Sequence, residues 1–250
     1  MKTAYLDGPG VLAMAHRGFS RTGLENSMAA FAAAVDLGFR YVETDVHATS
    51  DGVLLALHDS TLDRVTDRTG VIADLPWSAV REAKIAGTEP IPTFDELLET
   101  WPELRINIDC KAAGAVQPLA EAIERHGAHD RVCIASFSDR RRRSVLRQLT
   151  RPTATSAGPV TTGALAIGRI PLVHSAFGVD CIQIPQRVGS RPLVTARLIR
   201  SMHAREVQVH VWTVDDPDDM HRLLDLGVDG LITDRSDVLK DVLQQRNQWV

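Results

Sequence analysis

Long apolar runs are missing from this chain of 250 residues, because nowhere do 18 apolar residues follow one another. A membrane-spanning helix needs about 20 such residues, so no stable membrane insertion is predicted. The first residues, through Gly18, carry no long apolar stretch either, and no secretory signal is visible. We therefore expect a cytoplasmic protein.

Cysteine is also scarce. The three cysteines, Cys110, Cys133 and Cys181, each stand inside an apolar, strand-like run. An odd number of cysteines without a CxxC pair argues against a disulfide framework and against a zinc site. Buried, reduced thiols are the default in runs of this kind.

Basic residues show no excess, because 28 Lys and Arg stand against 32 Asp and Glu and give a formal net charge of -4. This balance offers no argument for nucleic acid or an anionic membrane as a partner. The one basic cluster is the run RRRR at 140–143. The solvated first turn of a helix explains this run better than a nucleic-acid site does.

Strand-like and helix-like segments alternate along the chain, which predicts a parallel sheet. With a hydrophobic content of 44%, the chain can bury a sizeable core. Nine candidate strands are separated by helical stretches or turns. The candidate strands are 11–15, 40–46, 53–58, 105–111, 131–137, 153–158, 181–185, 207–214 and 229–234.

The strand at 53–58 follows a turn signal and is interpreted as the antiparallel half of a hairpin. Eight parallel strands remain, which predicts a TIM-like (β/α)8 barrel with a small hairpin insertion after the second strand. No linker or repeat divides the sequence, so residues 1–250 are interpreted as a single domain, with the oligomeric state left open. An open doubly wound sheet is the second choice, but no GxGxxG or Walker loop supports it.

One stretch, YVETDVHATSDGVLLALHD, carries the densest set of reactive groups. Asp51 and Gly52 stand between two runs of strand-forming residues and predict a hairpin with a two-residue loop. Such a loop places Asp45 directly opposite His58, with the two side chains on one face. Glu43 lies two residues before Asp45 and shares that face. The hairpin would therefore hold two carboxylates beside an imidazole.

Polar side chains gather at the expected carboxyl ends of the strands, where the active sites of such barrels lie. Glu43, Asp45 and Asp109 would repel one another there unless a cation neutralised them. Hard divalent cations prefer oxygen ligands, so these three carboxylates predict a site for Mg²⁺ or Ca²⁺ rather than zinc.

Four more side chains at the same ends indicate phosphate chemistry. Arg17 and Lys111 suit an anion, and phosphate is the natural candidate. Imidazoles titrate near neutral pH, so His16 and His58 are candidates for a general acid and base. Together with the carboxylates they predict phosphoryl transfer or phosphodiester cleavage. The strand ends carry two further candidate substrate-binding residues, Gln183 and Trp212.

The sequence resembles the glycerophosphodiester phosphodiesterase family in a series of short motifs. The motifs are AHRG at 15–18, ENS at 25–27, ETDV at 43–46, TSDG at 49–52, HD at 58–59, and later IPTFDELL, NIDCK, VWTVDD and GVDGLITDR. They keep the order and spacing of the family and span nearly the whole chain. Each piece alone is unspecific, but the combination is highly specific.

The resemblance implies a metal-dependent hydrolase that converts glycerophosphodiesters to glycerol 3-phosphate and an alcohol. By the family pattern, the two histidines form the acid/base pair, Arg17 and Lys111 hold the phosphate, and the three carboxylates bind the metal. The chain departs from the family at two positions, with Asp109 in place of the usual Glu and Ser27 in place of the usual Thr.

Two alternatives stay open at this point. A lysophospholipase D acting on lysophospholipids would need an apolar mouth or lid, and the loop at 61–90 is short and mixed in character. A non-catalytic phospholipid-headgroup binder could dispense with one histidine, whereas His16 and His58 are both present. The sequence therefore favours the glycerophosphodiester phosphodiesterase.

Overall fold

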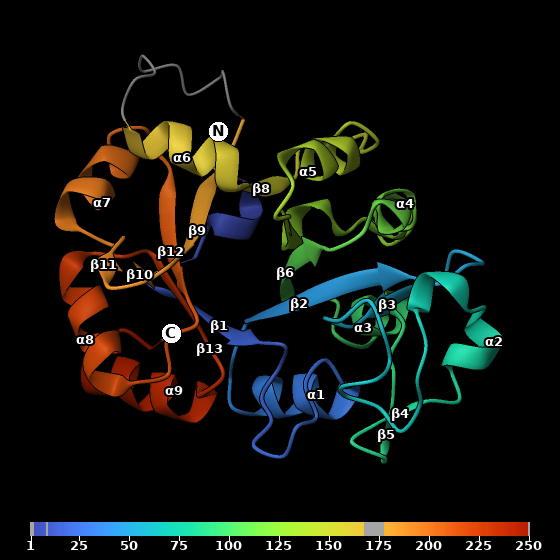
Figure 1. The fold of residues 1–250 in the computed structure, drawn as a ribbon. Helices are drawn as coiled ribbons and strands as arrows, with labels where there is room; N and C mark the ends of the chain where they lie inside the picture. The colour runs from blue at the N-terminus through green and yellow to red at the C-terminus, as the bar shows by residue number, and fades with distance from the viewer. Residues whose placement is uncertain (1–2, 9, 168–177, 250) are drawn as a thin grey trace.

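The structure is a computed structural model that describes residues 3–8, 10–167 and 178–249. Eight parallel strands form a closed barrel, because the first strand pairs with both the second and the last. The predicted barrel is confirmed (Figure 1). Its strands are β1 (Leu12–His16), β2 (Tyr41–Ala48), β6 (Arg105–Cys110), β7 (Val132–Ala135), β8 (Ala154–Ala157), β9 (Cys181–Pro185), β12 (Gln208–Trp212) and β13 (Gly230–Thr233).

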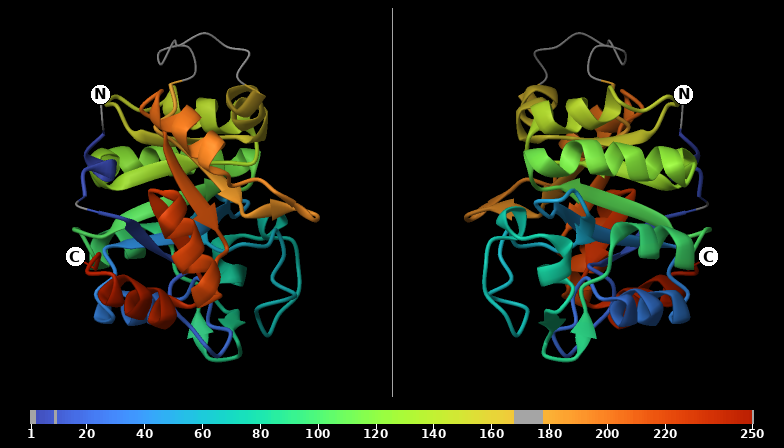
Figure 2. Two further views of the ribbon diagram at one scale, coloured as in Figure 1. Left: turned by 90° about the vertical axis from the view of Figure 1, so that its left-hand side faces the viewer. Right: turned by 90° about the vertical axis from the view of Figure 1, so that its right-hand side faces the viewer.

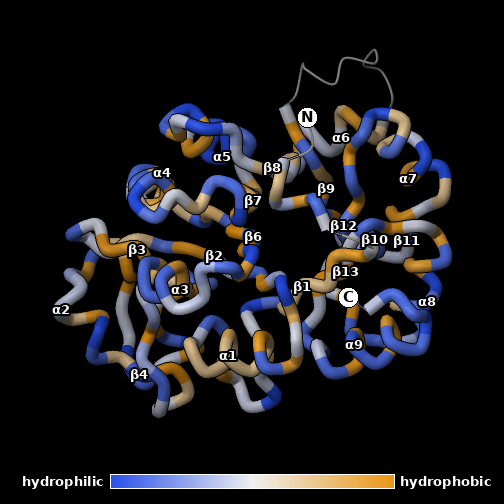
Figure 3. The backbone as a smooth tube through the Cα atoms, turned by 180° about the vertical axis from the view of Figure 1, so that it is seen from behind, coloured by the Kyte–Doolittle hydropathy of each residue, from blue (hydrophilic) through white to orange (hydrophobic). Residues whose placement is uncertain are grey.

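Helices surround the barrel and cover its outer face (Figure 1). In Figure 3 apolar residues run along the strands and alternate with polar residues on the helices, as expected for helices with one buried face. The helices are α1 (Met28–Asp36), α2 (Trp77–Val80), α3 (Phe94–Thr100), α4 (Val116–Arg125), α5 (Asp139–Leu146), α6 (Pro159–Ile167), α7 (Ala196–His203), α8 (Pro217–Leu226) and α9 (Ser236–Gln245).

Local sequence signals start several of these helices. Ser27 caps α1 by accepting a hydrogen bond from the backbone N–H of Ala30, and Thr93 forms a capping box with Glu96 at α3. Ser236 precedes the last helical stretch in the sequence and would be expected to cap it, but it does not. Ser236 is the first residue inside α9, and its hydroxyl is buried without a hydrogen-bond partner.

The sequence predicts that residues 60–90 form an irregular excursion with a short helix near 77–83. The segment between β2 and α3 contains β3 (Leu54–Ala56), the expected short helix as α2, and in addition the short pair β4 (Lys84–Ile85) and β5 (Glu89–Pro90). It also has an apolar cluster of its own, separate from the main core. The buried members of this cluster are Leu55, Leu57, Leu62, Ile72, Val80, Ala83, Ile85 and Ile91.

The barrel interior is filled in layers, because alternate residues of each strand point inward. An apolar layer includes Met14, Tyr41 and Cys133, and the fully buried Tyr5 packs against it from a short turn of 3-10 helix at Ala4–Leu6. All three cysteines are buried and free. No helix among the described residues is long and apolar enough to cross a membrane.

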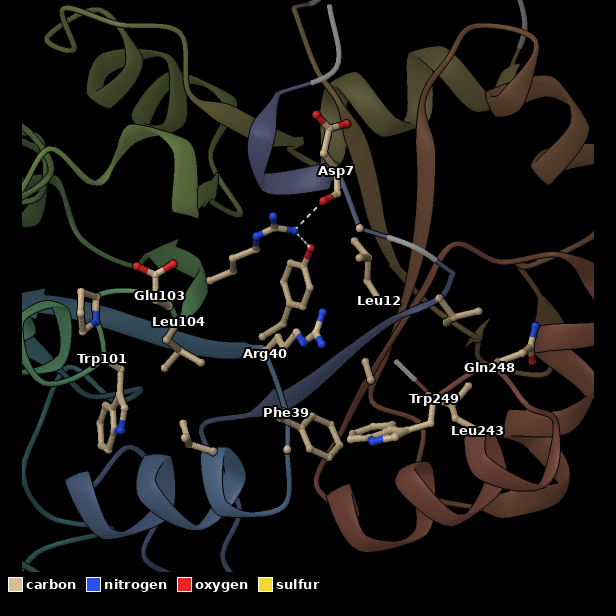
Figure 4. A pocket seen from close by; sticks show the side chains of 18 of the residues that line it. Asp7, Leu12, Phe39, Arg40, Trp101, Glu103, Leu104, Leu243, Gln248 and Trp249 are labelled. Carbon is tan, nitrogen blue, oxygen red and sulfur yellow. Dashed lines mark hydrogen bonds between the residues drawn. The ribbon is translucent and has the colours of Figure 1, made fainter.

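A cavity of about 620 Å³ lies at the amino-terminal end of the barrel (Figure 4). Phe39, Trp101 and Trp249 contribute to its lining, and Phe39 and Trp249 pack edge to face. Here Arg105 donates hydrogen bonds to the Tyr41 hydroxyl and to backbone carbonyls, while the Tyr41 hydroxyl donates to the carbonyl of Tyr5 at 2.9 Å. Arg105, the Tyr41 hydroxyl and the carbonyls of Tyr5 and Asp7 are thus bonded in one network.

Candidate active site

A second pocket, of about 570 Å³, opens at the carboxyl ends of the barrel strands. The structure brings all nine residues that the sequence analysis singled out into its lining. These are His16, Arg17, Glu43, Asp45, His58, Asp109, Lys111, Gln183 and Trp212. Eight of them come from barrel strands or the residue directly after one, and His58 comes from the end of the hairpin. Their individual roles stay predictions.

Two cations neutralise Asp45 at the bottom of this pocket. Lys111 Nζ lies 2.8 Å from Asp45 Oδ1 and 2.7 Å from Asp109 Oδ2, and Arg17 Nε lies 3.2 Å from Asp45 Oδ2. Burial by itself would raise the pKa of Asp45, but Lys111 and Arg17 outweigh it and lower that pKa. Burial raises the pKa of Asp109, with Lys111 opposing the shift only in part.

Glu43 is buried in the same cluster without a comparable partner. Its Oε2 atom makes no hydrogen bond, and His16 Nε2 lies 3.7 Å away. Burial, together with the negative charge of Asp45, raises the pKa of Glu43 to about 8. A carboxylate in this position is stabilised by the arrival of positive charge.

Each of the two histidines is held by a carboxylate at Nδ1. His16 Nδ1 lies 2.7 Å from Asp234 Oδ1, and His58 Nδ1 lies 2.6 Å from Asp59 Oδ1. Burial would lower the pKa of His16, but Glu43 and Asp234 outweigh it and raise that pKa. A bond at Nδ1 fixes the ring and leaves Nε2 for other partners.

Neither Asp59 nor Asp234 is predicted from the sequence as a partner of these histidines. Asp59 appears there only as the second letter of the HD motif, and Asp234 only as the last residue of the candidate strand 229–234 and a member of the GVDGLITDR motif. The missing signal is spatial, because β13 lies beside β1 only when the barrel closes. Asp59 is in turn held by Arg64, whose Nε donates to Oδ2 at 2.6 Å.

The predicted hairpin register is wrong by one residue. Asp45 faces Leu57, whose N–H donates to the carbonyl of Asp45 at 2.9 Å, so Asp45 is not opposite His58. The loop has three residues, because Thr49 and Val53 already bond to each other across it. Asp51 favours this longer loop by accepting a hydrogen bond from the Thr49 hydroxyl at 2.6 Å.

His58 reaches the pocket in spite of the shifted register. The strand β3 ends at Ala56, so the direction of the His58 side chain does not follow the alternation of side chains along a strand. Gly52 completes the loop with a φ of 86°, a left-handed conformation that glycine adopts without strain. The expected cluster therefore forms by a different local route from the one the sequence indicated.

Backbone strain accompanies the placement of Arg17. Its φ is 55°, and Asn26 has a φ of 57°, both in the left-handed region that L-residues other than glycine seldom adopt. The two residues bond to each other through the N–H of Asn26 and the carbonyl of Arg17 at 2.9 Å. The neighbouring Gly18 is required as well, because a Cβ there would meet the Ala30 backbone at 2.6 Å.

Asn26 and Glu25, which stand out in the sequence only as part of the ENS motif, also support the charged cluster. The Asn26 side chain accepts a hydrogen bond from Thr44 at 2.7 Å and donates one to Asp45 at 3.5 Å. Glu25 accepts from Arg17 Nη1 at 2.9 Å. These contacts hold Arg17 and Asp45 in place from the side of α1.

Gln183 and Trp212 lie on the wall of the pocket opposite the hairpin. The amide of Gln183 pairs with that of Asn107, with N–O distances of 2.9 and 3.3 Å. Trp212 packs edge to face against Phe137, with ring centroids 5.9 Å apart. Gln183 is therefore already hydrogen-bonded, while Trp212 gives this wall an apolar surface.

The carboxylates supply the right donor atoms for a hard divalent cation. Glu43 Oε2 and Asp109 Oδ1 are both buried without a hydrogen bond, and carboxylate oxygens are the ligands that Mg²⁺ and Ca²⁺ prefer. Among residues 3–8, 10–167 and 178–249, however, no three His, Cys, Asp or Glu side chains converge as they would around a metal. Instead, Lys111 and Arg17 form ion pairs with Asp45.

Comparisons with known proteins agree with this geometry. Residues 16–238 match the sequence profile of the Glycerophosphoryl diester phosphodiesterase family. The chain is 49% identical over 254 residues to a protein of Mycobacterium tuberculosis named "Probable glycerophosphodiester phosphodiesterase 2", covering 98% of this chain and 95% of that protein.

Solved structures with the same fold cover almost the whole chain. A glycerophosphodiester phosphodiesterase from Agrobacterium tumefaciens has a TM-score of 0.78 and 22% identity, with 94% of this chain and 99% of that chain covered. A phosphodiesterase from Oleispira antarctica, solved with the product sn-glycerol-3-phosphate, has a TM-score of 0.79 and 20% identity, with 94% and 97% covered. The family match and the 49% identical relative, taken with this fold, show that the chain belongs to the glycerophosphoryl diester phosphodiesterase family and is a phosphoric diester hydrolase.

Proposed function

We propose that this enzyme hydrolyses glycerophosphodiesters to glycerol 3-phosphate and an alcohol, with His16 and His58 as the general acid and base. The observation that carries the proposal is the pair of imidazoles, each held by a carboxylate at Nδ1 beside a pocket that contains Arg17 and Lys111. This arrangement leaves Nε2 of both rings for proton exchange with a substrate.

In the proposed reaction one histidine takes a proton from the nucleophile and the other protonates the leaving alcohol. The nucleophile is the neighbouring glycerol hydroxyl or a water molecule. We assign His16 as the base, because Asp234 at 2.7 Å and Glu43 stabilise the imidazolium that forms when it accepts a proton. His58 is assigned as the acid, with Asp59 holding its ring.

We further propose that Glu43, Asp45 and Asp109 hold a divalent cation, Mg²⁺ or Ca²⁺. The two unpartnered carboxylate oxygens and the raised pKa of Glu43 support this assignment. The cation would supply positive charge close to the phosphodiester. In the structure Lys111 forms ion pairs with Asp45 and Asp109. We expect Lys111 to leave these carboxylates and to bind the phosphate when the cation and substrate are present.

Turnover of glycerophosphocholine with and without EDTA tests both parts of the proposal. We expect chelation to abolish turnover and added Mg²⁺ or Ca²⁺ to restore it, with glycerol 3-phosphate as a product. Full activity after exhaustive chelation would exclude the metal, while the substrate assignment would stand. Absence of turnover with every cation would instead contradict the substrate assignment.

Lysophospholipids are a second candidate substrate class, favoured by the apolar wall of the pocket. From the sequence this alternative ranks lower, because the loop at 61–90 is short and mixed in character. The wall comes from other segments, with Phe137, Leu193 and Trp212 among its lining residues. Comparing kcat/KM for lysophosphatidylcholine and glycerophosphocholine tests the alternative, and a preference for the lipid would support it. Membership of a hydrolase family sets the non-catalytic headgroup binder aside.

We also propose a cytoplasmic location and a small-molecule substrate rather than nucleic acid. The free, buried state of all three cysteines is compatible with a reducing compartment. The formal net charge of -4 supplies no general attraction for nucleic acid. Fractionation of the native host, with the protein followed by antibody, would test the location.

A further inference from the structure

Large apolar side chains are exposed around the mouth of the catalytic pocket. Three of them, Phe137, Val188 and Leu193, line the pocket itself, and Val160 follows the lining residue Pro159. The described residues contain five exposed large hydrophobic side chains, with exposed fractions of 62% for Phe137, 78% for Val160, 62% for Val188, 37% for Leu193 and 43% for Val71. Four of the five therefore belong to one region, which we call the rim patch: Phe137, Val160, Val188 and Leu193.

A small hairpin carries part of the rim patch away from the barrel. It consists of β10 (Arg187–Val188) and β11 (Arg191–Pro192), which pair with each other in a sheet of two strands. Figure 2 shows the hairpin projecting from the body of the molecule. Its base is held at Gln186, which accepts hydrogen bonds from Arg222 at 2.7 Å and from the N–H of Leu193 at 2.9 Å.

Two arginines on this hairpin flank Val188. Arg187 precedes it and Arg191 faces it across the hairpin, and both are exposed. Within the part of the chain that the structure describes, neither forms a hydrogen bond or an ion pair. Guanidinium groups without partners next to exposed apolar side chains match a surface that presents phosphate groups above a hydrocarbon layer.

We propose that the rim patch, with Arg187 and Arg191, docks this enzyme on a phospholipid surface. The apolar side chains enter the headgroup region, and the two guanidinium groups bind lipid phosphates. A protein partner fits this face less well, because a stable partner would cover the opening through which substrate must enter. The inference goes beyond the proposed function, since hydrolysis of a water-soluble glycerophosphodiester requires no surface.

The overall charge of the chain does not predict this behaviour. The formal net charge of -4 refers to the whole molecule. Surface attraction falls off within a Debye length of roughly 8–10 Å, so the charges nearest the lipid dominate. The two hairpin arginines are therefore expected to favour anionic lipid in spite of the net negative charge.

Sedimentation of the full chain with vesicles tests the proposal. The probes are vesicles of phosphatidylcholine and vesicles of phosphatidylcholine mixed with phosphatidylserine. We expect partition onto both, stronger with phosphatidylserine and weakened by salt. Val160→Ser combined with Val188→Ser should lower the partition coefficient about ten-fold on both vesicles. Arg187→Gln combined with Arg191→Gln should lower it by about ten-fold or more on the mixed vesicles and less on phosphatidylcholine.

Matched control variants are available elsewhere on the surface. Val71→Ser removes an exposed valine outside the rim patch, and Arg40→Gln with Arg147→Gln removes two exposed arginines that lie off the hairpin. Both controls should partition like the unchanged chain. No sedimentation of the unchanged chain, or equal losses in the controls, would overturn the proposal.

The outcome can be separated from that of the proposed function. Val160→Ser alone and the arginine double variant should keep turnover of soluble glycerophosphocholine, because none of these residues lines the pocket. Loss of turnover together with vesicle binding would assign them to catalysis and overturn a docking role. Vesicle binding by a chain that hydrolyses no glycerophosphodiester would leave docking intact and contradict the proposed function.

Discussion

Two glutamates at opposite ends of the barrel have opposite environments. Glu43 at the pocket is buried, lacks a hydrogen bond at Oε2 and has a pKa raised to about 8 by burial and by Asp45. Glu124, near the carboxyl end of α4, accepts hydrogen bonds from the Thr150 N–H at 2.5 Å, the Thr150 hydroxyl at 2.8 Å and His129 at 3.0 Å. These bonds, that of the Thr150 backbone first, lower the pKa of Glu124 to about 2.

The difference supports the proposed location of the active site at the carboxyl end of the barrel. At the amino-terminal end Tyr41 and Arg105 are bonded to each other, and Glu124 is bonded to Thr150 and His129, contacts that stabilise the fold. At the carboxyl end Glu43 and Asp109 keep unpartnered oxygens, and Arg17 adopts a strained backbone conformation. Groups arranged in this way cost stability, and they are typical of sites where a ligand completes the set of contacts.

The largest expected effect comes from removing an imidazole at the pocket. His16→Ala or His58→Ala should lower kcat/KM by about 10²–10⁴-fold or more, because positioned proton transfer contributes that much. The chain should stay folded, since both rings line the pocket and do not pack in the apolar core. Steady-state kinetics with glycerophosphocholine and thermal unfolding by circular dichroism measure the two quantities.

A nitrophenyl ester substrate separates the roles of the two histidines. Nitrophenolate needs no proton on departure, so loss of His58, the proposed acid, should be partly rescued, while loss of His16, the proposed base, should not. Equal damage from both substitutions on both substrates would contradict this division. Rates like those of the unchanged enzyme in either alanine variant would end the acid/base assignment.

Glu43→Gln should separate stability from activity. In EDTA at pH 7 the substitution removes a carboxyl group whose pKa is raised to about 8 by burial and by Asp45, a shift that costs the folded chain stability at this pH, so the free energy of unfolding should rise by about 1–3 kcal/mol. Activity in Mg²⁺ should fall, because a proposed ligand is lost. Urea unfolding in EDTA and kinetics in Mg²⁺ provide the readouts. A less stable variant in EDTA would show that Glu43 is already well accommodated without a metal.

Tyr41→Phe should have the reverse effect at the other end of the barrel. It removes the hydroxyl that donates to the Tyr5 carbonyl and accepts from Arg105, so the free energy of unfolding should fall by about 1 kcal/mol. Turnover should stay the same, because Tyr41 does not line the catalytic pocket. A loss of activity without a loss of stability would contradict the view that the amino-terminal end stabilises the fold while the carboxyl end carries the proposed catalysis.

The smallest effect should follow from Glu124→Gln and should depend on pH. The folded pKa of Glu124, about 2, lies below its ordinary value of 4.5, so ionised Glu124 stabilises the folded chain above pH 4.5. This contribution is lost as the pH falls from 4.5 through 2. The variant should therefore be less stable than the unchanged chain at pH 7, with the difference shrinking in acid. Urea midpoints at several pH values measure it, and a difference that does not change with pH would refute the role of the charge.

The fold and the residues that line the pocket could be predicted, because both follow from the alternation of strands and helices. Once eight parallel strands close, the residues at their carboxyl ends must meet, whichever helices lie between them. The assembly of Glu43, Asp45 and Asp109 near Lys111 needed no more than that. Their placement is set by topology and by the inward-pointing positions of each strand.

The rest depended on contacts that a linear sequence does not display. The hairpin register was decided by the Thr49 and Asp51 side chains, which close a three-residue loop where the Asp-Gly signal indicated two. The Asp234 carboxylate meets His16 only through barrel closure. The apolar wall arises from Phe137 and Leu193, which lie on different loops and form no pattern along the chain.

The apolar layer beneath the pocket also limits the paths by which substrate can enter and products can leave. Met14, Tyr41 and Cys133 fill the barrel, and Tyr5 is buried against them, so the described structure gives the pocket a closed floor. We therefore expect the substrate and both products to pass through the same opening of the pocket. In the proposed reaction the alcohol would leave past the apolar wall, and the phosphate-bearing product would have to separate from Arg17 and Lys111. We expect release of glycerol 3-phosphate, rather than bond cleavage, to be the rate-limiting step.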